Sequence, residues 1–286
     1  MSVSRATVSQ SAQGSRSNAA RTVTHSVIDP RLEAIRRQPT NAPASGSSNR
    51  RTRFPSPTSP RNVDRPDLSN IDSVDKSVAV LRSKEALRSF APSEFDLADA
   101  VSSAGLSERL GEGACLGVSL EWATARMKNP QANIIGKDGH LSGTDVLTHV
   151  FRVQREYEIK QGEAKSAGMQ LDPEAASRTA IGQMLASRGI NFSHSGGGFD
   201  TEAIARTVSE PGTHIISLTG LNDGHAISVF TPPAHTRDPR LIVFDPNAGE
   251  FKMHSSEADY FFTALQARYN TIGWRYGGVD IFSVYA

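Results

Sequence analysis

The spacing of hydrophobic positions divides the chain into a part without a pattern and a part with one. Residues 1 to about 70 show neither helical nor strand periodicity and are rich in Ser, Arg, Pro, Asn and Ala. A segment of this composition buries too little apolar surface to offset the entropy of ordering. We therefore predict a disordered tail over residues 1–70, with one short helix allowed near DPRLEAIRRQ, and a folded body over residues 71–286.

The first half of the body has apolar positions at helical spacing. In ACLGVSLEWATARMKN, the residues Leu116, Leu120 and Met127 fall on one face, and Pro130 ends the segment. Four other stretches are predicted to be helical in the same way. They are SVDKSVAVLRSKEALRSFA (with a short strand before the helix as the alternative), SGTDVLTHVFRVQREYEIKQGEAK with a Ser or Thr cap, DPEAASRTAIGQMLASRG ended by Gly189, and DTEAIARTVSE.

The second half of the body consists mainly of short β-rich runs separated by Gly, Pro, Asn and Asp. The predicted strands are GTHIISLTG, GHAISVFTP, RLIVFDPN, GEFKMHS and the closing VDIFSVYA, and one helix, SSEADYFFTALQARY, interrupts them. Helices followed by antiparallel strands predict an α+β domain.

Charge separates the tail from the body. Residues 1–66 hold eleven Arg, no Lys and three acidic residues, which leaves 20 basic and 27 acidic residues for the rest of the chain. A basic arm on an acidic body is typical of a tail with its own role, such as an export signal, although a plain solvated linker is an equal alternative. No aromatic residues interleave with the arginines as stacking platforms, so we expect no nucleic-acid partner.

The chain contains a single cysteine, Cys115. One cysteine excludes an internal disulfide and a zinc site built mainly of thiolates. No stretch has the length and apolarity of a membrane helix, and the N-terminus lacks the apolar core of a secretory signal peptide. We therefore expect a soluble protein that works in a reducing compartment.

Cys115 occupies a position where a thiol becomes nucleophilic. It lies at the start of a predicted helix, where the pKa of a thiol falls, and Gly111, Gly113 and Ala114 leave the approach uncrowded. The alternative is that Cys115 is a small buried hydrophobic residue.

Two further residues point to the same chemistry. His225 opens the apolar run GHAISVF, and Asp245 ends the apolar run LIVFD, where a buried carboxylate needs a partner. If 223–230 and 240–245 pair as antiparallel strands, His225 and Asp245 meet at one end of the hairpin. An Asp-Pro-Asn turn cap is the alternative role of Asp245. The long intervening loop TPPAHTRDPR is expected to lie near the site and to shape specificity.

Three segments, GACLGVSLEWA, DGHAISVF and FDPNAGEF, resemble the catalytic blocks of the YopT/AvrPphB family of cysteine proteases, which are effectors injected by bacteria into host cells. The resemblance implies a papain-like α+β fold without metal or organic cofactor. It also implies that Cys115 is the nucleophile, His225 the general base and Asp245 the orienting acid, with the backbone N–H of Cys115 as the first oxyanion-hole donor. The matching residues expected to serve only in packing are Ser119, Trp122 and Phe251.

The chain also departs from this family. Relatives supply a second oxyanion donor from an Asn or Gln shortly before the cysteine, and LSERLGEGA contains neither. The remaining candidates for this second donor are Ser107, Arg109 and a backbone amide. Ser2 stands where N-myristoylation needs glycine, and the tail has no cysteine to palmitoylate, so neither route to a membrane is encoded. The sequence VDKSV suggests a self-cleavage site between Lys76 and Ser77.

These observations favour an effector thiol protease that is delivered by a bacterial type III system and cleaves a host signalling protein. A small GTPase or a receptor-associated kinase is the expected class of substrate, and the protein is expected to be a monomer. Two alternatives remain open at this stage. One is an inactive papain-like docking protein, which the missing donor would favour, and the other is a deamidase or transglutaminase that uses the same Cys-His-Asp site.

Overall fold

The computed structural model describes residues 65–286, except for residues 91, 136–138, 170–171, 221–223, 237 and 286. The tail predicted over residues 1–70, with its short helix, therefore lies almost entirely outside the described residues. Near the proposed boundary, Leu68 and Ile71 are buried in the core of the body. The boundary at residue 70 stays a prediction.

The helices predicted for the body are all present, and the described residues add one, α2, that the sequence did not indicate. The additional helix, α2, is short and buries only Val101, so its apolar pattern is weak. The predicted Ser or Thr cap of the long helix α4 is wrong, because the N-cap is Gly143 and the hydroxyl of Ser142 donates to the carbonyl of Gly139 instead. The helices of the described part are α1 (Lys76–Arg88), α2 (Leu97–Ser103), α3 (Cys115–Lys128), α4 (Thr144–Ala164), α5 (Pro173–Ser187), α6 (Thr201–Val208) and α7 (Ala258–Thr271).

The strands form one antiparallel sheet in the order β1-β6-β2-β3-β4-β5. The strand β1 was not predicted, because its sequence NFSHSGGG is polar, glycine-rich and largely exposed. It pairs along its whole length with β6 at the edge of the sheet, so backbone hydrogen bonds rather than side-chain burial hold it. The strands are β1 (Asn191–Gly198), β2 (Gly212–Gly220), β3 (Gly224–Thr231), β4 (Leu241–Asp245), β5 (Gly249–Met253) and β6 (Tyr276–Tyr285).

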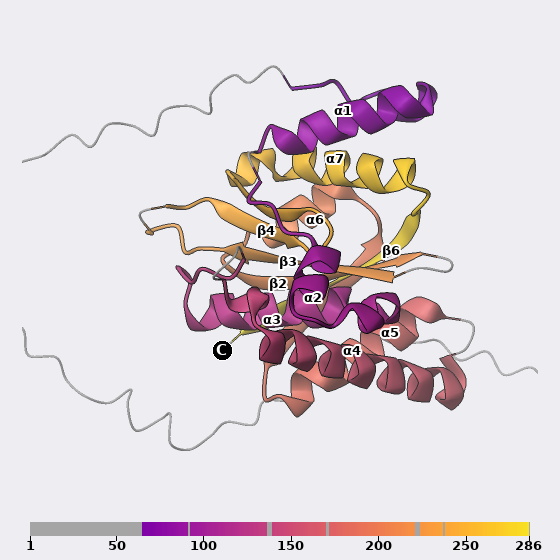
Figure 1. Ribbon diagram of the computed structural model, residues 1–286. Coiled ribbons are helices and arrows are strands. Elements are labelled where there is room, and N and C mark those ends of the chain that lie inside the picture. The colour runs from indigo at the N-terminus through magenta and orange to yellow at the C-terminus, as the bar shows by residue number, and fades with distance from the viewer. Residues whose placement is uncertain are drawn as a thin grey trace, which may run out of the picture. The chain divides into compact units, whose positions relative to one another are not determined.

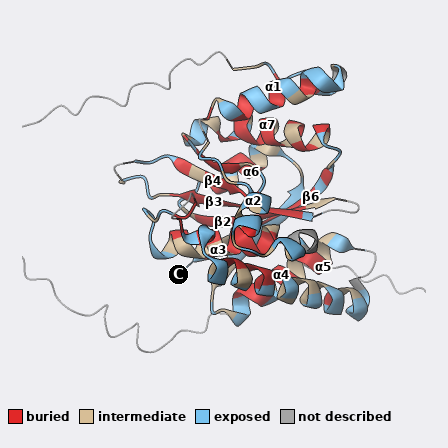
Figure 2. Ribbon diagram, viewed as in Figure 1, coloured by how far each residue is buried: buried red, intermediate tan, exposed pale blue. Residues whose placement is uncertain are grey.

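Helices cover both faces of the sheet (Figure 1). In β3, Ile227 and Val229 point to the layer of α1, α6 and α7, while Ala226 and Phe230 point to the layer of α2 to α5. The central strands are accordingly buried on both faces, and the helices expose their outer sides (Figure 2). This architecture confirms the predicted α+β fold with early helices and a C-terminal antiparallel sheet.

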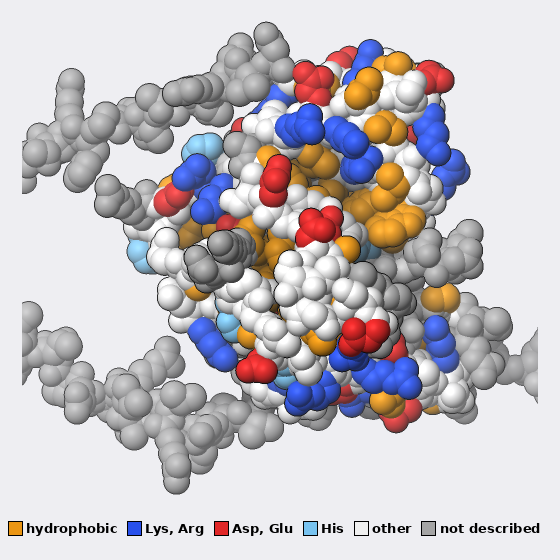
Figure 3. Space-filling view, in the orientation of Figure 1, with side chains coloured by type: hydrophobic (Ala, Val, Ile, Leu, Met, Phe, Trp, Pro, Cys, Tyr) orange, Lys and Arg blue, Asp and Glu red, His pale blue; other side chains and the backbone are white. Residues whose placement is uncertain are grey.

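The surface of this body is mixed in charge. On the face seen in Figure 3, acidic and basic side chains are interspersed over the helices, and hydrophobic side chains gather between them. Among the described helices, none has both the length and the apolarity required to cross a bilayer.

Candidate active site

The helix α3 presents Cys115 as its first residue. Its side chain is half-buried, and the sulfur lies 3.9 Å from the carbonyl oxygen of Gly224 at the start of β3. The backbone N–H groups of Ala226 and Leu116 lower the pKa of the thiol. The first turn of α3 and the first residues of β3 thus meet at one end of the sheet, and Cys115 lies at a helix N-terminus, as predicted.

The hairpin of β3 and β4 brings His225 and Asp245 together. The two strands pair antiparallel, with Val229 opposite Val243, so the start of β3 lies beside the end of β4. His225 Nε2 is 3.1 Å from Asp245 Oδ1, and both side chains are buried. The pairing and the contact inferred from the sequence are therefore both present.

Cys115 and His225 line the same cleft, and the interaction between them changes the pKa of both side chains. Since Asp245 engages Nε2, Nδ1 is the ring nitrogen available to the sulfur. Burial raises the pKa of the Cys115 thiol, but the hydrogen bond from His225 and its charge outweigh this effect and bring the pKa below its ordinary value. Burial lowers the pKa of His225, but the Asp245 carboxylate and the bonds to Asp245 and Cys115 raise it to about 10. Both shifts favour the charged forms, a thiolate on Cys115 and an imidazolium on His225.

Asp245 has three hydrogen-bond donors around its carboxylate. Besides His225, the hydroxyl of Tyr269 donates to Oδ2, and the backbone N–H of Asn247 donates to Oδ1 at 2.8 Å. Burial raises the pKa of this carboxyl, and the charge of His225 together with these bonds brings it below the ordinary value. Asp245 therefore caps its turn and also contacts the imidazole, so the contacts expected from both interpretations of the sequence are present.

Aromatic rings enclose His225, and sequence reasoning missed them. The ring centroids of Tyr269, Trp274 and Tyr276 lie 5.3, 6.0 and 6.5 Å from that of the imidazole. They limit the access of water to the His225–Asp245 pair, which strengthens its electrostatic interaction. The dense aromatic run YNTIGWRY at the end of α7 was the signal that could have indicated them.

A cleft of about 650 Å³ opens beside Cys115 and His225. One wall comes from α4, with Gln154, Tyr157 and Gln161, and Trp274 lies at another side. The cleft is large enough to hold several residues of an extended peptide. Sequence reasoning did not single out any of the side chains from α4.

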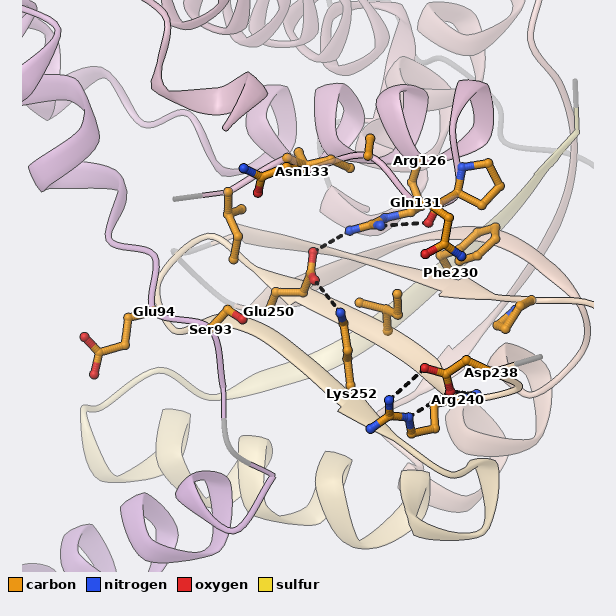
Figure 4. A pocket seen from close by; sticks show the side chains of 16 residues that line it. Ser93, Glu94, Arg126, Gln131, Asn133, Phe230, Asp238, Arg240, Glu250 and Lys252 are labelled. Carbon is orange, nitrogen blue, oxygen red and sulfur yellow. Dashed lines mark hydrogen bonds and ion pairs between the residues drawn. The ribbon is translucent and has the colours of Figure 1, made fainter. Parts of the chain in front are cut away.

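The long loop TPPAHTRDPR is not at the cleft, so this expectation was wrong. Because β3 and β4 are antiparallel, the loop joins the ends of the strands that lie away from His225 and Asp245. Its residues Pro232, Asp238 and Arg240 line a different cavity of about 440 Å³, near the C-terminal end of α3 (Figure 4).

Two serines fasten α3 to β3. The hydroxyl of Ser119 donates to the carbonyl oxygen of Ala226 at 2.8 Å. The hydroxyl of Ser228 donates to the carbonyl oxygen of Ser119, also at 2.8 Å. Both residues are fully buried. Ser119 was expected only to pack, but this reciprocal pair fixes the helix that carries Cys115 against the strand that carries His225.

A buried carboxylate joins the first and third sequence blocks. Glu250 on β5 accepts hydrogen bonds from Trp122 Nε1 at 3.0 Å and from Arg126 Nη2 at 2.7 Å. Trp122 also stacks on Phe244, with ring centroids 5.5 Å apart. Figure 4 shows Glu250 lying between Arg126 on α3 and Lys252 on β5. Trp122 is thus a packing residue, as expected, and a hydrogen-bond donor as well.

Phe251 follows Glu250 and is buried against Phe261 of α7, which agrees with its expected role in packing. Within the described ranges, no group of three or more His, Cys, Asp or Glu side chains is placed to hold a metal ion.

Comparisons with known proteins point to one group. The family model described as Yersinia/Haemophilus virulence surface antigen, Peptidase_C58, matches residues 88–275. The protein y4zC of Sinorhizobium fredii (strain NBRC 101917 / NGR234), whose name describes a YopT-like cysteine protease, is 28% identical over 180 residues. That match covers 58% of this chain and 63% of y4zC, so the chain spans a little less than two thirds of this relative's length.

The structural comparison agrees with this grouping. The crystal structure of the Pseudomonas avirulence protein AvrPphB is similar, with a TM-score of 0.54 and 22% sequence identity. The match covers 70% of this chain and 100% of the other. This similarity concerns the fold, and it confirms the α+β architecture indicated by the sequence.

Proposed function

Because the chain belongs to the Yersinia/Haemophilus virulence surface antigen family, Peptidase_C58, we propose that it is a cysteine endopeptidase that acts through Cys115, His225 and Asp245. The observation that carries this proposal is that Cys115 and His225 line one cleft, and that His225 contacts a fully buried carboxylate. A cysteine that served only in core packing would need neither a cleft nor a charged imidazole beside it.

Each residue of the triad has a defined task in the proposed reaction. The Cys115 thiolate attacks the carbonyl carbon of a peptide bond, and the His225 imidazolium gives its proton to the departing amine. A water molecule then attacks the thioester, with His225 accepting its proton, and the carboxylic acid product leaves. Asp245 keeps the imidazole in place and stabilises its charged form throughout.

The biological setting is part of the proposal. Membership in a family described by a virulence antigen supports an effector that a bacterial type III system delivers into a host cell, with residues 1–70 as the export segment. The proposed substrate is a host signalling protein of the small GTPase or receptor-associated kinase class. We propose that the enzyme acts as a monomer and binds no nucleic acid.

Self-processing between Lys76 and Ser77 has a structural requirement. This bond lies in the first turn of α1, and the Asp75 carboxylate accepts the N–H of Ser77 at 2.8 Å. Proteases bind extended backbone, so this turn must unwind before cleavage. N-terminal sequencing of a fragment formed only by wild type tests the site, and a fragment that starts at any residue other than Ser77 excludes it.

Labelling with a thiol-directed activity probe tests the proposed function. We expect the wild type to be labelled rapidly and both Cys115→Ala and His225→Ala to lose labelling. Cleavage of an unfolded test protein such as casein then separates a peptidase from a deamidase or transglutaminase, which would release ammonia. Labelling no faster than that of the unfolded chain would favour the docking protein instead.

A further inference from the structure

The helix α4 approaches the first turn of α3 unusually closely. A Cβ atom added to Gly117 would lie 2.4 Å from the carbonyl oxygen of Val150, so only glycine fits there. This contact brings the next turn of α4, which carries Gln154, to the N-terminal end of α3 beside Cys115.

Gln154 is 8% exposed and lines the cleft together with Cys115 and His225. Its Oε1 accepts the backbone N–H of Gly117 at 3.4 Å. An N–H group can only donate, so the amide oxygen must face Gly117 and the Nε2 group must point away from it. No described residue accepts a hydrogen bond from Nε2. The structure thus presents an amide donor at the wall of the cleft, on a largely buried side chain that is fixed through its Oε1.

The chemistry of acyl transfer provides a use for this donor. Attack of a thiolate on a carbonyl places negative charge on the carbonyl oxygen, and preorganised N–H donors stabilise it. The N–H of Cys115, in the first turn of α3, is one such donor, because N–H groups there have no partner within the helix. The segment LSERLGEGA before the cysteine offers no Asn or Gln as the second.

We propose that Gln154 Nε2 is the second oxyanion-hole donor, supplied from α4 rather than from the segment before the cysteine. This inference rests on the proposed function and assigns one more catalytic residue to the same site. The two side chains that the sequence left as candidates for this donor, Ser107 and Arg109, are less suitably placed to reach the oxyanion. The guanidinium of Arg109 lies over the ring of Phe151, 4.3 Å from its centroid, Ser107 is exposed, and neither of them lines the cleft.

The test compares two reactions of the same thiolate. With p-nitrophenyl acetate, the sulfur attacks the carbonyl carbon, the π electron pair moves to the oxygen, and collapse of this oxyanion expels p-nitrophenolate and leaves an acetyl thioester. With iodoacetamide, the sulfur displaces iodide at a saturated carbon and no oxyanion forms. The ratio of the two rates cancels changes in the fraction of thiolate and reports on oxyanion stabilisation alone.

Gln154→Glu is the decisive variant, because it keeps an oxygen for the N–H of Gly117 but replaces the donor with a second oxygen. We expect it to lower the acylation-to-alkylation ratio at least ~10-fold, towards the 10²–10³ typical of losing one donor. Gln154→Met, which lacks both the amide oxygen and the amide donor, should lower this ratio to a similar extent. Gln183→Glu makes the same charge change on the exposed side of α5 and should leave the ratio unaltered.

The possible outcomes separate the two proposals. If the acylation-to-alkylation ratio of Gln154→Glu stays within ~3-fold of wild type, Gln154 is not an oxyanion donor. A ratio that falls in Gln154→Met but not in Gln154→Glu would likewise show that Gln154 only caps α3. If the wild type is acylated no faster than Cys115→Ala, the proposed acyl-transfer function fails and the oxyanion role falls with it. If Gln154→Met does not fold, Gln154→Glu decides the matter.

Discussion

Asp245 is fully buried and contacts His225. It affects the pKa of Cys115 indirectly, because it stabilises the charged form of His225. This single residue therefore controls two protonation states. Without the carboxylate, the pKa of His225 would fall because burial opposes its charged form, and the thiolate would be stabilised less by the imidazolium.

The pH dependence of Cys115 alkylation should show this coupling. In the wild type, the lowered thiol pKa means that the rate of reaction with iodoacetamide should rise at a pH below 9.0, the ordinary thiol pKa. In Asp245→Asn, the curve should move to more alkaline pH, because the thiol pKa rises when its charged partner is lost. Rates measured by mass spectrometry over roughly pH 5 to 10 test this, and superimposable curves would contradict it.

Hydrolysis should have an alkaline limit as well. The leaving amine needs a proton from His225, whose pKa is raised to about 10, so peptidase activity should fall as the pH rises through that value. The loss should begin at lower pH in Asp245→Asn. A wild-type profile that declines at pH 7 would show that His225 is not held in its charged form.

Tyr269→Phe removes one of the donors to Asp245 and little else. We expect a loss of about 1–3 kcal/mol in the free energy of unfolding, because a buried carboxylate oxygen loses its partner. The alkylation curve should move much less than in Asp245→Asn, because the charged carboxylate beside His225 is kept. Tyr260→Phe is the matched control, since it removes a hydrogen bond to the carbonyl of Pro66 and should leave the alkylation curve unaltered.

At the scale of elements, the site depends on how closely α3 is held against its neighbours. The Ser119–Ser228 pair fixes it to β3, and the absence of a side chain at Gly117 lets α4 approach. The glycine and serine of CLGVS thus set the position of Cys115 without reacting themselves.

Gly117→Ala should separate α3 from α4. The added methyl group would overlap the carbonyl of Val150, so we expect a loss of about 1–3 kcal/mol in unfolding free energy and a lower acylation rate of Cys115. Gly162→Ala is the control, because it lies within α4 with open space around it and should stabilise the protein by about 0.5–1 kcal/mol. Urea unfolding of both variants measures the difference, and equal effects would contradict the close approach.

At the scale of the whole molecule, Glu250 connects α3, β5 and the segment before α2. Its carboxylate binds Trp122 and Arg126, and its backbone pairs with Ser93 in an isolated bridge. Glu250→Ala would leave the charge of Arg126 buried without its partner, so we expect a loss of about 3–5 kcal/mol in unfolding free energy. Glu202→Ala breaks an exposed pair with Arg206 and should cost no more than about 0.5 kcal/mol.

The sequence by itself determined the fold class, most of the elements and the positions of the three site residues. Helical and strand periodicity are local properties, and the antiparallel hairpin fixes which ends of its strands meet, so the contact of His225 with Asp245 followed from the pattern. The strand β1 escaped prediction because it is held by backbone pairing at a sheet edge, and this leaves no apolar period in the sequence.

Only the tertiary structure decided which distant side chains surround the triad. Gln154, Tyr269 and Trp274 come from helices and a loop far from Cys115 in the sequence, and each reaches the site through packing that no local pattern encodes. The loop after β3 lies away from the cleft for a different reason, because the hairpin that brings His225 and Asp245 together places this loop at the opposite ends of the two strands. Periodicity specifies what each segment becomes, but the environment of a buried charge depends on which segments pack against each other.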